Sequence, residues 1–579
     1  MMRNRLIEGH AVRGNIFRTR VIVLLFFLGL GLLTSRLVYL QIFITQDISK
    51  KAVKQHQKTI IFEGERGKIL DRQGRILAAN LEVPSLYAIP SIITNPESVA
   101  EEMALIVNEP KSLLVDKLSD GKSFTWIKRK VNPEISTAIE NLGLESVGIM
   151  MEPERFYPKR HLMGHILGFV GAENQGLEGI EKQYDTVLHG KKVSITLERD
   201  ARGEEVFPRG LDYHFPNKGE DLYLTIDEVI QYISEKELDS MMSESGAESG
   251  TVIVIQPKTG DILAWVVRPD FNPNSVRSYS PADWRNRGIT DSYEPGSTFK
   301  IVTASAALEE KVVTPSEVIF CENGYYDIDG KPIHDHTREG MLTFSQVIQK
   351  SSNIGTAKVA LRLGENNLKH YLQAFGFGAR TGIDLNGEVP GIVNSSAHLS
   401  RRTVASISIG QGISVTPLQM ATAFSVIANG GLLIKPHVVK KLSQEKKNPR
   451  LEPTESPRRV ISEQTANAVN RILQTVVQEG GTGEKAAMPG YVVAGKTGTA
   501  QTVNPMTHTY SASQFVASFG GFVPAHDPQL IILVVIQHPK GISWGGSVAA
   551  PVFKNIATQA LSYLEIPPYD TKRILVVQK

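Results

Sequence analysis

The chain has 579 residues, enough for roughly three or four domains. Hydrophobic residues make up 41% and charged residues 21%, which excludes a collagen-like, coiled-coil or wholly disordered chain. The formal net charge is only +3 and is concentrated in arginines among the first 20 residues, so the basic surface of a duplex-binding protein is missing. Cys321 is the only cysteine, which excludes an intrachain disulfide and a cysteine-based metal site.

An apolar segment near the N-terminus has the length of a membrane-spanning helix. Residues 21–33 form an unbroken apolar run, and the apolar character resumes after Arg36 as far as Phe43. A helix needs about 20 residues to cross the hydrocarbon core, and an arginine near its end can reach the headgroups. We therefore expect a transmembrane helix at 21–43, after a tail at 1–20.

The alternative to an anchor is a cleaved signal peptide, which also begins with basic residues and an apolar run. No small-residue cleavage motif follows, since the first alanine after the run is Ala52. The arginines before the run favour a cytoplasmic N-terminus, although Lys50, Lys51 and Lys54 weaken this bias. No second run of comparable length follows. We expect a single-pass protein of the cytoplasmic (inner) membrane, with its later residues outside the cytoplasm.

The rest of the chain divides into two regions that differ in the length of their predicted elements. Residues 44–220 combine short strand-like runs with turns, as around Gln73-Gly74, which indicates a loosely built α+β region. From about Asp221 the elements become longer, beginning with a strand and an amphipathic helix. A second domain is therefore predicted over residues 221–565, before a tail at 566–579.

The second domain alternates strand and helix patterns. A β-hairpin is predicted at 251–267, further strands at 491–502 and 529–538, and helices at 341–364 and 417–431. Helices between hairpin strands favour an α+β fold with a mainly antiparallel sheet between helices, beside a helical subdomain. The polar, proline-broken stretch at 440–459 is expected to be a solvated loop.

One short motif carries residues suited to acyl transfer by a serine. A serine hydroxyl is a poor nucleophile until a neighbouring base takes its proton. In Ser297-Thr298-Phe299-Lys300 the lysine lies three positions after the serine, which places both on one face of a helix. Turn residues before Ser297 predict that it lies in the first helical turn, where free N–H groups favour negative charge.

Spacing alone does not single out this motif. The same serine–lysine spacing occurs at 119–122 and 443–446, in polar stretches expected to face solvent, and K-T-G also occurs at 258–260 in the predicted hairpin turn. The distinguishing feature is an ordered set of three motifs. They are S-x-x-K at 297–300, S-S-N at 351–353 and K-T-G-T at 496–499.

With this ordered set the chain resembles the penicillin-recognising serine transpeptidases, whose signatures are S-x-x-K, S-x-N and K-T-G. The resemblance covers nearly the whole chain after the apolar segment and is closest to the class B penicillin-binding proteins, through RGKILDRQG at 66–74 and YEPGSTFK at 293–300. TGIDLNGE at 381–388 and GGSVAAPVF at 545–553 favour the septal, cell-division members of the FtsI type over elongation-specific ones.

The resemblance implies a catalytic role for several motif residues. Ser297 attacks the carbonyl of the penultimate D-alanine of a peptidoglycan stem. Lys300 takes the hydroxyl proton, if burial and the nearby Lys496 lower its pKa. Ser351 passes the proton to the departing D-alanine, while Asn353 orients Lys300.

The K-T-G-T motif is implied to bind the substrate. Backbone N–H groups of Ser297 and Thr499 form the oxyanion hole, and Lys496, Thr497 and Thr499 hold the terminal carboxylate of the stem or of a β-lactam. The substrate-binding positions are Ser352, Thr497, Gly498 and Thr499. The amine of a neighbouring stem then releases the acyl-enzyme and completes the cross-link, without a cofactor or a metal.

The resemblance also implies partners. Glycan polymerisation is assigned to a separate SEDS-type, FtsW-like membrane glycosyltransferase, because the chain has no second large catalytic region. Residues 44–220 are expected to act as a pedestal, resembling a dimerisation domain, that holds the active site away from the bilayer and docks other divisome proteins.

Several of these residues have purely structural alternatives. Ser351 and Ser352 can cap a helix, and residues 410–412 can form a turn near the cleft. His334-Asp335-His336 resembles a metal-binding segment, but such a polar loop more often faces solvent. At the level of function, the alternatives are a β-lactamase or D,D-carboxypeptidase and a non-catalytic scaffold or β-lactam sensor.

Overall fold

The structure is a computed structural model of the whole chain. It describes residues 2–43, 57–122, 124–198, 218–394, 396–443, 456–503, 509–541 and 544–568. Contacts divide the chain into two units. The first unit contains residues 1–63, 83–152 and 192–215, and the second contains residues 64–82, 153–191 and 216–579.

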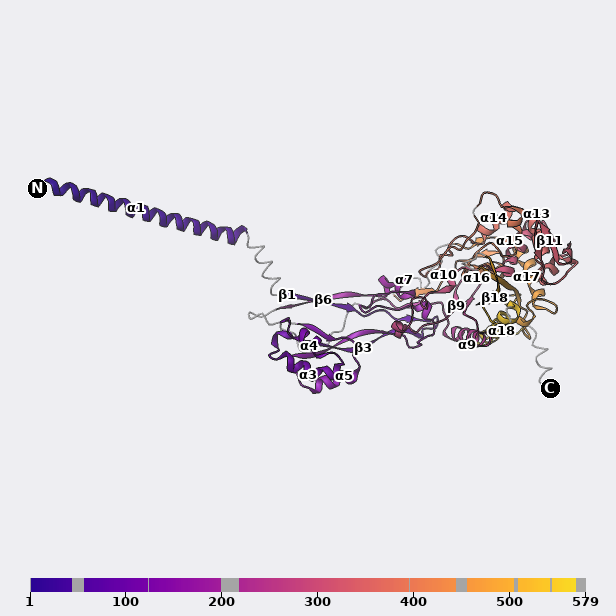
Figure 1. The fold of residues 1–579 in the computed structure, drawn as a ribbon, viewed down its shortest axis with the longest axis horizontal. Helices are drawn as coiled ribbons and strands as arrows, with labels where there is room; N and C mark the ends of the chain where they lie inside the picture. Colours follow the sequence, from indigo (N-terminus) through magenta and orange to yellow (C-terminus); the bar gives the residue numbers. More distant parts are fainter. Residues whose placement is uncertain are drawn as a thin grey trace. The chain divides into compact units, whose positions relative to one another are not determined.

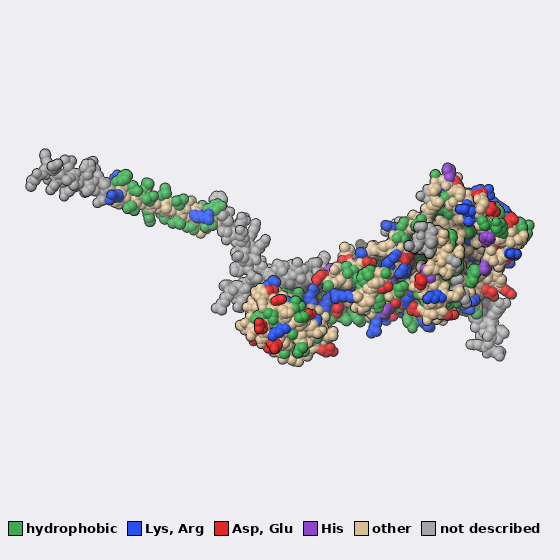
Figure 2. All heavy atoms as spheres, viewed as in Figure 1, with side chains coloured by type: hydrophobic (Ala, Val, Ile, Leu, Met, Phe, Trp, Pro, Cys, Tyr) green, Lys and Arg blue, Asp and Glu red, His purple; other side chains and the backbone are tan. Residues whose placement is uncertain are grey.

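The first unit begins with a long helix, α1 (Met2–Val38), which continues as a π-helical turn, η1 (Tyr39–Phe43). Its stretch from Phe17 to Ile42 is the one described helix long and apolar enough to cross a membrane. Figure 2 shows hydrophobic side chains along this stretch, with basic side chains near each end. The predicted apolar segment at 21–43 therefore lies in a helix of spanning length.

The remainder of the first unit is a small α+β module. Its elements are β1 (Gln57–Gly64), β4 (Thr125–Lys128), α3 (Pro96–Val107), α4 (Lys111–Leu118), α5 (Pro133–Asn141), β6 (Gly190–Glu198) and parts of β3 (Ile76–Ala88) and β5 (Val147–Phe156). Met103, Leu114, Ile127 and Ile139 pack together in its core. The predicted α+β character of this region is confirmed.

Early and late segments of the chain pair within the second unit. The strands β15 (Val439–Leu442), β7 (Leu222–Leu224) and β2 (Ile69–Leu70) are neighbours, and β2 also pairs with the first part of β3. Three short helices follow along the chain: α6 (Gly164–Leu167), α7 (Gly179–Gln183) and α8 (Asp185–Leu188). Residues 64–82 and 153–191, which the prediction places before the boundary near Asp221, pack with the residues after it.

The second unit contains a five-stranded antiparallel sheet in the order β17-β18-β19-β8-β9. Its strands are β8 (Ser249–Ile255), β9 (Ile262–Arg268), β17 (Ala494–Val503), β18 (Tyr510–Val523) and β19 (Leu530–Gln537). The hairpin predicted at 251–267 is confirmed as β8 and β9, and the later strand predictions are confirmed as β17 and β19. In this order β17 lies at an edge, so one side of its backbone is open to a ligand.

Helices cover both faces of this sheet. They are α9 (Glu228–Ser245) and α18 (Gly545–Tyr563), which lie side by side on one face (Figure 1), and α16 (Pro417–Ala428) on the other. Side chains alternate along a strand, so Val252 and Val254 pack with α9 and α18 while Ile253 and Ile255 pack with α16. This alternation explains why β8, β9 and β19 are apolar along most of their length.

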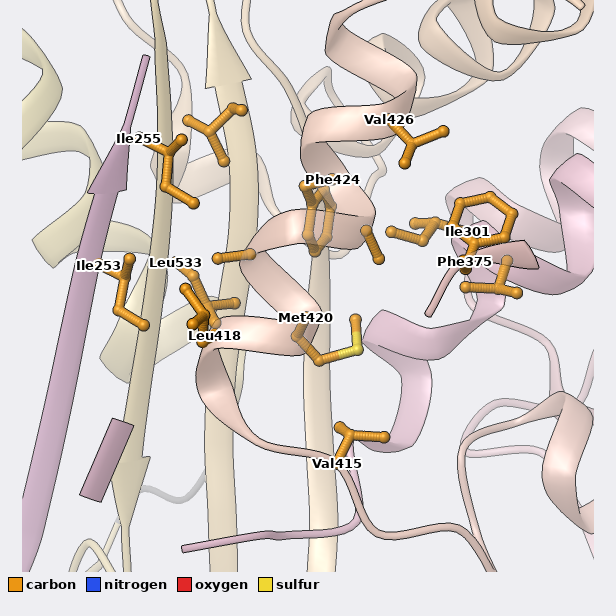
Figure 3. Packing of buried hydrophobic residues seen from close by; sticks show 14 of the residues in the cluster. Ile253, Ile255, Ile301, Phe375, Val415, Leu418, Met420, Phe424, Val426 and Leu533 are labelled. Carbon is orange, nitrogen blue, oxygen red and sulfur yellow. The ribbon is translucent and has the colours of Figure 1, made fainter. Parts of the chain in front are cut away.

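Figure 3 shows the core between the sheet and the helical part of the unit. Ile253, Ile255 and Leu533 point from the sheet toward α16, where Leu418 and Phe424 meet them. The other side of α16 faces side chains of the helical part, which include the α11 residue Ile301. The helix that follows the S-x-x-K motif therefore packs against α16, which in turn packs against the sheet.

The helical part of the second unit surrounds the S-x-x-K and S-S-N motifs. Its helices are α10 (Arg287–Thr290), η4 (Gly296–Phe299), α11 (Lys300–Glu309), α12 (Phe344–Gln349), α13 (Asn353–Leu363), α14 (Glu365–Ala374), α15 (Arg401–Ser408) and α17 (Glu463–Val477). Two hairpin-like pairs are inserted in it: β10 (Val318–Phe320) with β13 (Met341–Thr343), and β11 (Tyr325–Ile328) with β12 (Lys331–His334).

The helical pattern predicted at 341–364 is confirmed over most of its length, as α12 and α13. Its first residues form β13, and a break at 350–352 separates the two helices. Ser351 at the break has φ +60, a left-handed conformation that no α-helix accommodates. The predicted loop at 440–459 lies largely outside the described residues; its described ends contribute β15 and β16 (Arg458–Arg459).

Candidate active site

The proposed nucleophile lies in a tight turn at the start of a buried helix. Ser297 belongs to the 3-10 turn η4, and Lys300 is the first residue of α11. Residues three apart eclipse each other in a 3-10 helix, so the motif spacing places the two side chains on one side of the turn. The Lys300 side chain is completely buried, and the Ser297 hydroxyl has no hydrogen-bond partner among the described residues.

The break between α12 and α13 brings Ser351 between two lysines. The Lys300 amino group donates to the Asn353 side-chain oxygen at 2.8 Å and to the Ser351 hydroxyl at 3.2 Å. The Lys496 amino group, from β17, donates to the same Ser351 hydroxyl at 2.9 Å. Residues from all three predicted motifs therefore meet at one hydroxyl group.

Burial changes the acid–base properties of both lysines. It lowers the pKa of Lys300 to about 7, against the attraction of the Asp335 carboxylate. Burial also lowers the pKa of Lys496 well below its usual value, and the positive charge of Lys300 lowers it further. Burial is thus the main cause of the lowered pKa of Lys300, and the predicted contribution of Lys496 is not among its causes. A lysine with a pKa near neutrality can act as a general base.

The edge strand β17 forms the opposite side of the site. Lys496 is completely buried, whereas Thr499 is partly exposed. The Thr497 hydroxyl hydrogen-bonds the Thr482 hydroxyl at 2.7 Å, and the Thr499 hydroxyl accepts from the N–H of Gly545 at 3.1 Å. These contacts fix the two threonine side chains of the K-T-G-T motif.

Gly498 allows the nucleophile turn to approach β17 closely. A Cβ atom at this position would lie 2.3 Å from the Ser518 hydroxyl oxygen and 3.0 Å from the Pro295 carbonyl oxygen. Real Cβ atoms do not make such contacts, so any side chain here would force the turn and the strand apart. Gly498 therefore shapes the site without a side chain.

We expect Gly498→Ala to destabilise the protein by about 1 to 3 kcal/mol and to slow acylation, because the added methyl group overpacks the contact between the turn and the strand. Thermal unfolding and β-lactam labelling measure the two effects. Gly340→Ala is the control, since its added Cβ would meet only one atom, at 3.5 Å. Equal stability of the two variants would contradict the packing explanation.

A cavity of about 790 Å³ opens over these residues. Of the predicted site residues, Ser297, Ser351, Asn353, Thr497 and Thr499 line it. Lys300 and Lys496 do not line the cavity. Both hydrogen-bond the hydroxyl of Ser351, which does line it. The three sequence motifs thus form one pocket, and the Ser297 hydroxyl, which no described residue hydrogen-bonds, lies at its surface.

Ser352, which is predicted to bind substrate, lies outside the cavity. Its side chain is 3% exposed, accepts from the N–H of Gly355 as the N-cap of α13, and donates to Asp335 at 2.6 Å. This geometry favours the helix-capping alternative for Ser352 over a contact with substrate.

The loop His334-Asp335-His336 is the main part of the site that the sequence does not predict. All three residues line the cavity, and the His336 ring packs against Trp544 with 4.1 Å between ring centroids. Asp335 also accepts from the N–H of Ile354 at 3.0 Å. Among the described residues no group of three His, Cys, Asp or Glu side chains is arranged to hold a metal ion. The loop is a wall of the pocket.

We expect Asp335→Asn to move the pH midpoint of acylation to a lower value by about one unit, because the lost negative charge no longer stabilises protonated Lys300. The acylation rate as a function of pH measures this shift. Asp327→Asn, which alters an exposed carboxylate of β11, is the control. A shift to higher pH in Asp335→Asn would contradict this account.

The fold and the three motifs define a serine-type acyltransferase. The family model of the penicillin binding protein transpeptidase domain matches residues 250–558, and that of the penicillin-binding protein dimerisation domain matches residues 61–224. The chain therefore belongs to the class B penicillin-binding proteins, and it is a peptidoglycan D,D-transpeptidase of that class.

Individual relatives agree with this family. The chain is 37% identical to stage V sporulation protein D of Bacillus subtilis, over 93% of this chain and 84% of the relative. It is 32% identical to the peptidoglycan D,D-transpeptidase FtsI of Escherichia coli, over 93% and 91% respectively. The crystal structure of penicillin binding protein 3 from Mycobacterium tuberculosis, complexed with aztreonam, is 28% identical and superposes with a TM-score of 0.68, covering 88% of this chain and 98% of that chain.

Proposed function

We propose that the chain cross-links peptidoglycan stem peptides through an acyl-enzyme on Ser297, and that it does so at the division septum. The observation that carries the chemical part is the Ser351 hydroxyl, which receives hydrogen bonds from both Lys300 and Lys496 beside the Ser297 pocket. A hydroxyl in this position can pass a proton between the nucleophile side and the leaving-group side of the site.

In the proposed acylation, Ser297 Oγ attacks the carbonyl carbon of the penultimate D-alanine while neutral Lys300 takes the hydroxyl proton. Asn353 holds the Lys300 amino group through its 2.8 Å hydrogen bond. Ser351 then relays a proton to the nitrogen of the terminal D-alanine as the C–N bond breaks. An amine of a neighbouring stem attacks the ester, and the Ser297 hydroxyl is restored.

The edge strand supplies the proposed binding groups. Backbone N–H groups of Ser297 and Thr499 would stabilise the oxyanion, a contribution of about 3 to 4 kcal/mol per donor to the barrier. Lys496 and the hydroxyls of Thr497 and Thr499 would attract the terminal carboxylate of the stem or of a β-lactam. The close approach of η4 to β17 at Gly498 supports this joint use of the turn and the strand.

The cellular part of the proposal rests on the relatives and on α1. FtsI of Escherichia coli matches nearly the whole chain, and α1 supplies a candidate single-pass anchor. We place the N-terminus in the cytoplasm and the second unit outside it, where an FtsW-like glycosyltransferase supplies glycan strands and divisome proteins are neighbours. The sporulation relative favours a second candidate, cross-linking in a sporulation wall.

Localisation and depletion in the native organism test the cellular part. A fluorescent fusion is expected at the septum of growing cells, and depletion is expected to produce filaments. A fusion distributed along the side wall would favour the elongation role, and one confined to sporulating cells would favour the second candidate. Acyl-enzyme lifetime with a fluorescent penicillin separates a transpeptidase from a β-lactamase, since turnover within seconds would contradict the transpeptidase.

A further inference from the structure

The carboxylate of Glu294 joins three chain segments around the nucleophile turn. Glu294 lies three residues before Ser297. One of its oxygens accepts from the backbone N–H of Gly412 at 2.9 Å, and the other accepts from the Tyr510 hydroxyl at 3.0 Å. Gly412 ends the turn at 410–412, and Tyr510 begins β18, the strand paired with β17. One side chain thereby connects the nucleophile turn, the 410–412 turn and the β17–β18 pair.

Backbone contacts hold the nucleophile turn on both sides of Glu294. Tyr293 and Val415 exchange two backbone hydrogen bonds of 2.9 Å, and the N–H of Gly296 donates to the Gly410 carbonyl at 3.0 Å. A Cβ atom at Gly410 would lie 2.1 Å from the Gly296 carbonyl oxygen. The two turns are therefore in backbone contact, and Glu294 extends this contact to β18.

The hydrogen bonds of the Glu294 side chain all go to other parts of the chain. It does not line the cavity that contains Ser297, and it forms no ion pair with a described residue. Its environment is half-buried, which raises its pKa. Its oxygens accept hydrogen bonds from Gly412 and Tyr510, a task that a neutral amide oxygen can also perform.

We propose that Glu294 is a positioning residue for acylation, which sets the place of the Ser297 oxygen relative to β17 by fastening the nucleophile turn to the 410–412 turn and to Tyr510. A nucleophile displaced by a fraction of an ångström loses rate, while binding of the ligand to the rest of the pocket persists. This proposal rests on the proposed role of Ser297 as nucleophile.

Stopped-flow acylation of the full chain by a fluorescent β-lactam tests the proposal, because it separates the non-covalent Kd from the acylation rate. We expect Glu294→Ala to slow acylation about 100-fold and to change the Kd less than about threefold. Glu294→Gln should recover to within about tenfold of the wild-type rate, since its amide oxygen still accepts from Gly412. Tyr510→Phe should slow acylation about fivefold, with no further loss when combined with Glu294→Ala.

Glu310→Ala is the matched control, because it removes another glutamate–tyrosine hydrogen bond, of 2.8 Å to Tyr371, at the end of α11. It should acylate at the wild-type rate. A wild-type rate in Glu294→Ala would overturn the proposal, as would Glu294→Gln acylating as slowly as Glu294→Ala. If Glu294→Ala fails to fold, the acylation rates of Glu294→Gln and Tyr510→Phe test the proposal instead. A wild-type rate in Tyr510→Phe would then overturn it. Wild-type protein that is not acylated at Ser297 would instead overturn the assignment of the nucleophile.

Discussion

Ser297→Ala is expected to abolish the release of D-alanine from a stem peptide ending in D-Ala-D-Ala, a loss of about 10⁶-fold. The substitution removes the oxygen that forms the ester bond, and no described residue hydrogen-bonds that oxygen in the free enzyme. The lysines, Ser351 and the threonines of β17 remain, so the substrate still binds while the covalent step is lost. Enzymatic detection of free D-alanine, with the full-length protein in detergent, measures this effect.

The control for this substitution is Ser316→Ala, which alters an exposed serine in the same unit. Its D-alanine release should equal that of the wild type. Thermal unfolding of both variants shows whether the fold is retained. A folded Ser297→Ala protein that still releases D-alanine at more than a trace rate would refute the assigned nucleophile.

The acylation rate is expected to rise about tenfold per pH unit below pH 7 and to level off above it, because the pKa of Lys300 is about 7. Below this pH Lys300 is an ammonium ion and has no lone pair to take the serine proton. Above it the amine is neutral and the rate no longer depends on its titration. The rate of acylation by a β-lactam, measured from pH 5 to pH 9, tests whether the rate rises with pH as expected.

Lys300→Met should slow acylation about 10³-fold and remove the rise with pH, since methionine has a similar length but no basic group. Lys331→Met, at an exposed position in β12, serves as the control and should keep both the rate and the pH profile. A Lys300→Met protein that retains the rise would place the titrating base elsewhere.

The parts of the site that the sequence predicts are those that depend on residue type and local spacing. The three-residue interval between Ser297 and Lys300 determines their common face, and the apolar runs of β8, β9 and β19 follow from a sheet covered on both sides. Burial of Lys300 could also be anticipated, because a lysine that takes the serine proton must be neutral.

The parts that the sequence does not predict depend on tertiary contacts. The left-handed Ser351 interrupts a stretch with helical periodicity, because its hydroxyl is held between lysines that are distant in the chain. The loop at 334–336 has the composition of a solvated turn, yet Asp335 caps α13 and His336 packs on Trp544. The Glu294 contacts likewise join positions more than 100 residues apart. No local pattern encodes such pairings.

The most direct test of the account is to label membranes containing the full chain with a fluorescent β-lactam and to map the modified residue by mass spectrometry. A single site of attachment at Ser297, lost in Ser297→Ala, is the predicted result. Attachment at any other residue would contradict the claim that the three motifs form one acylation site around Ser297.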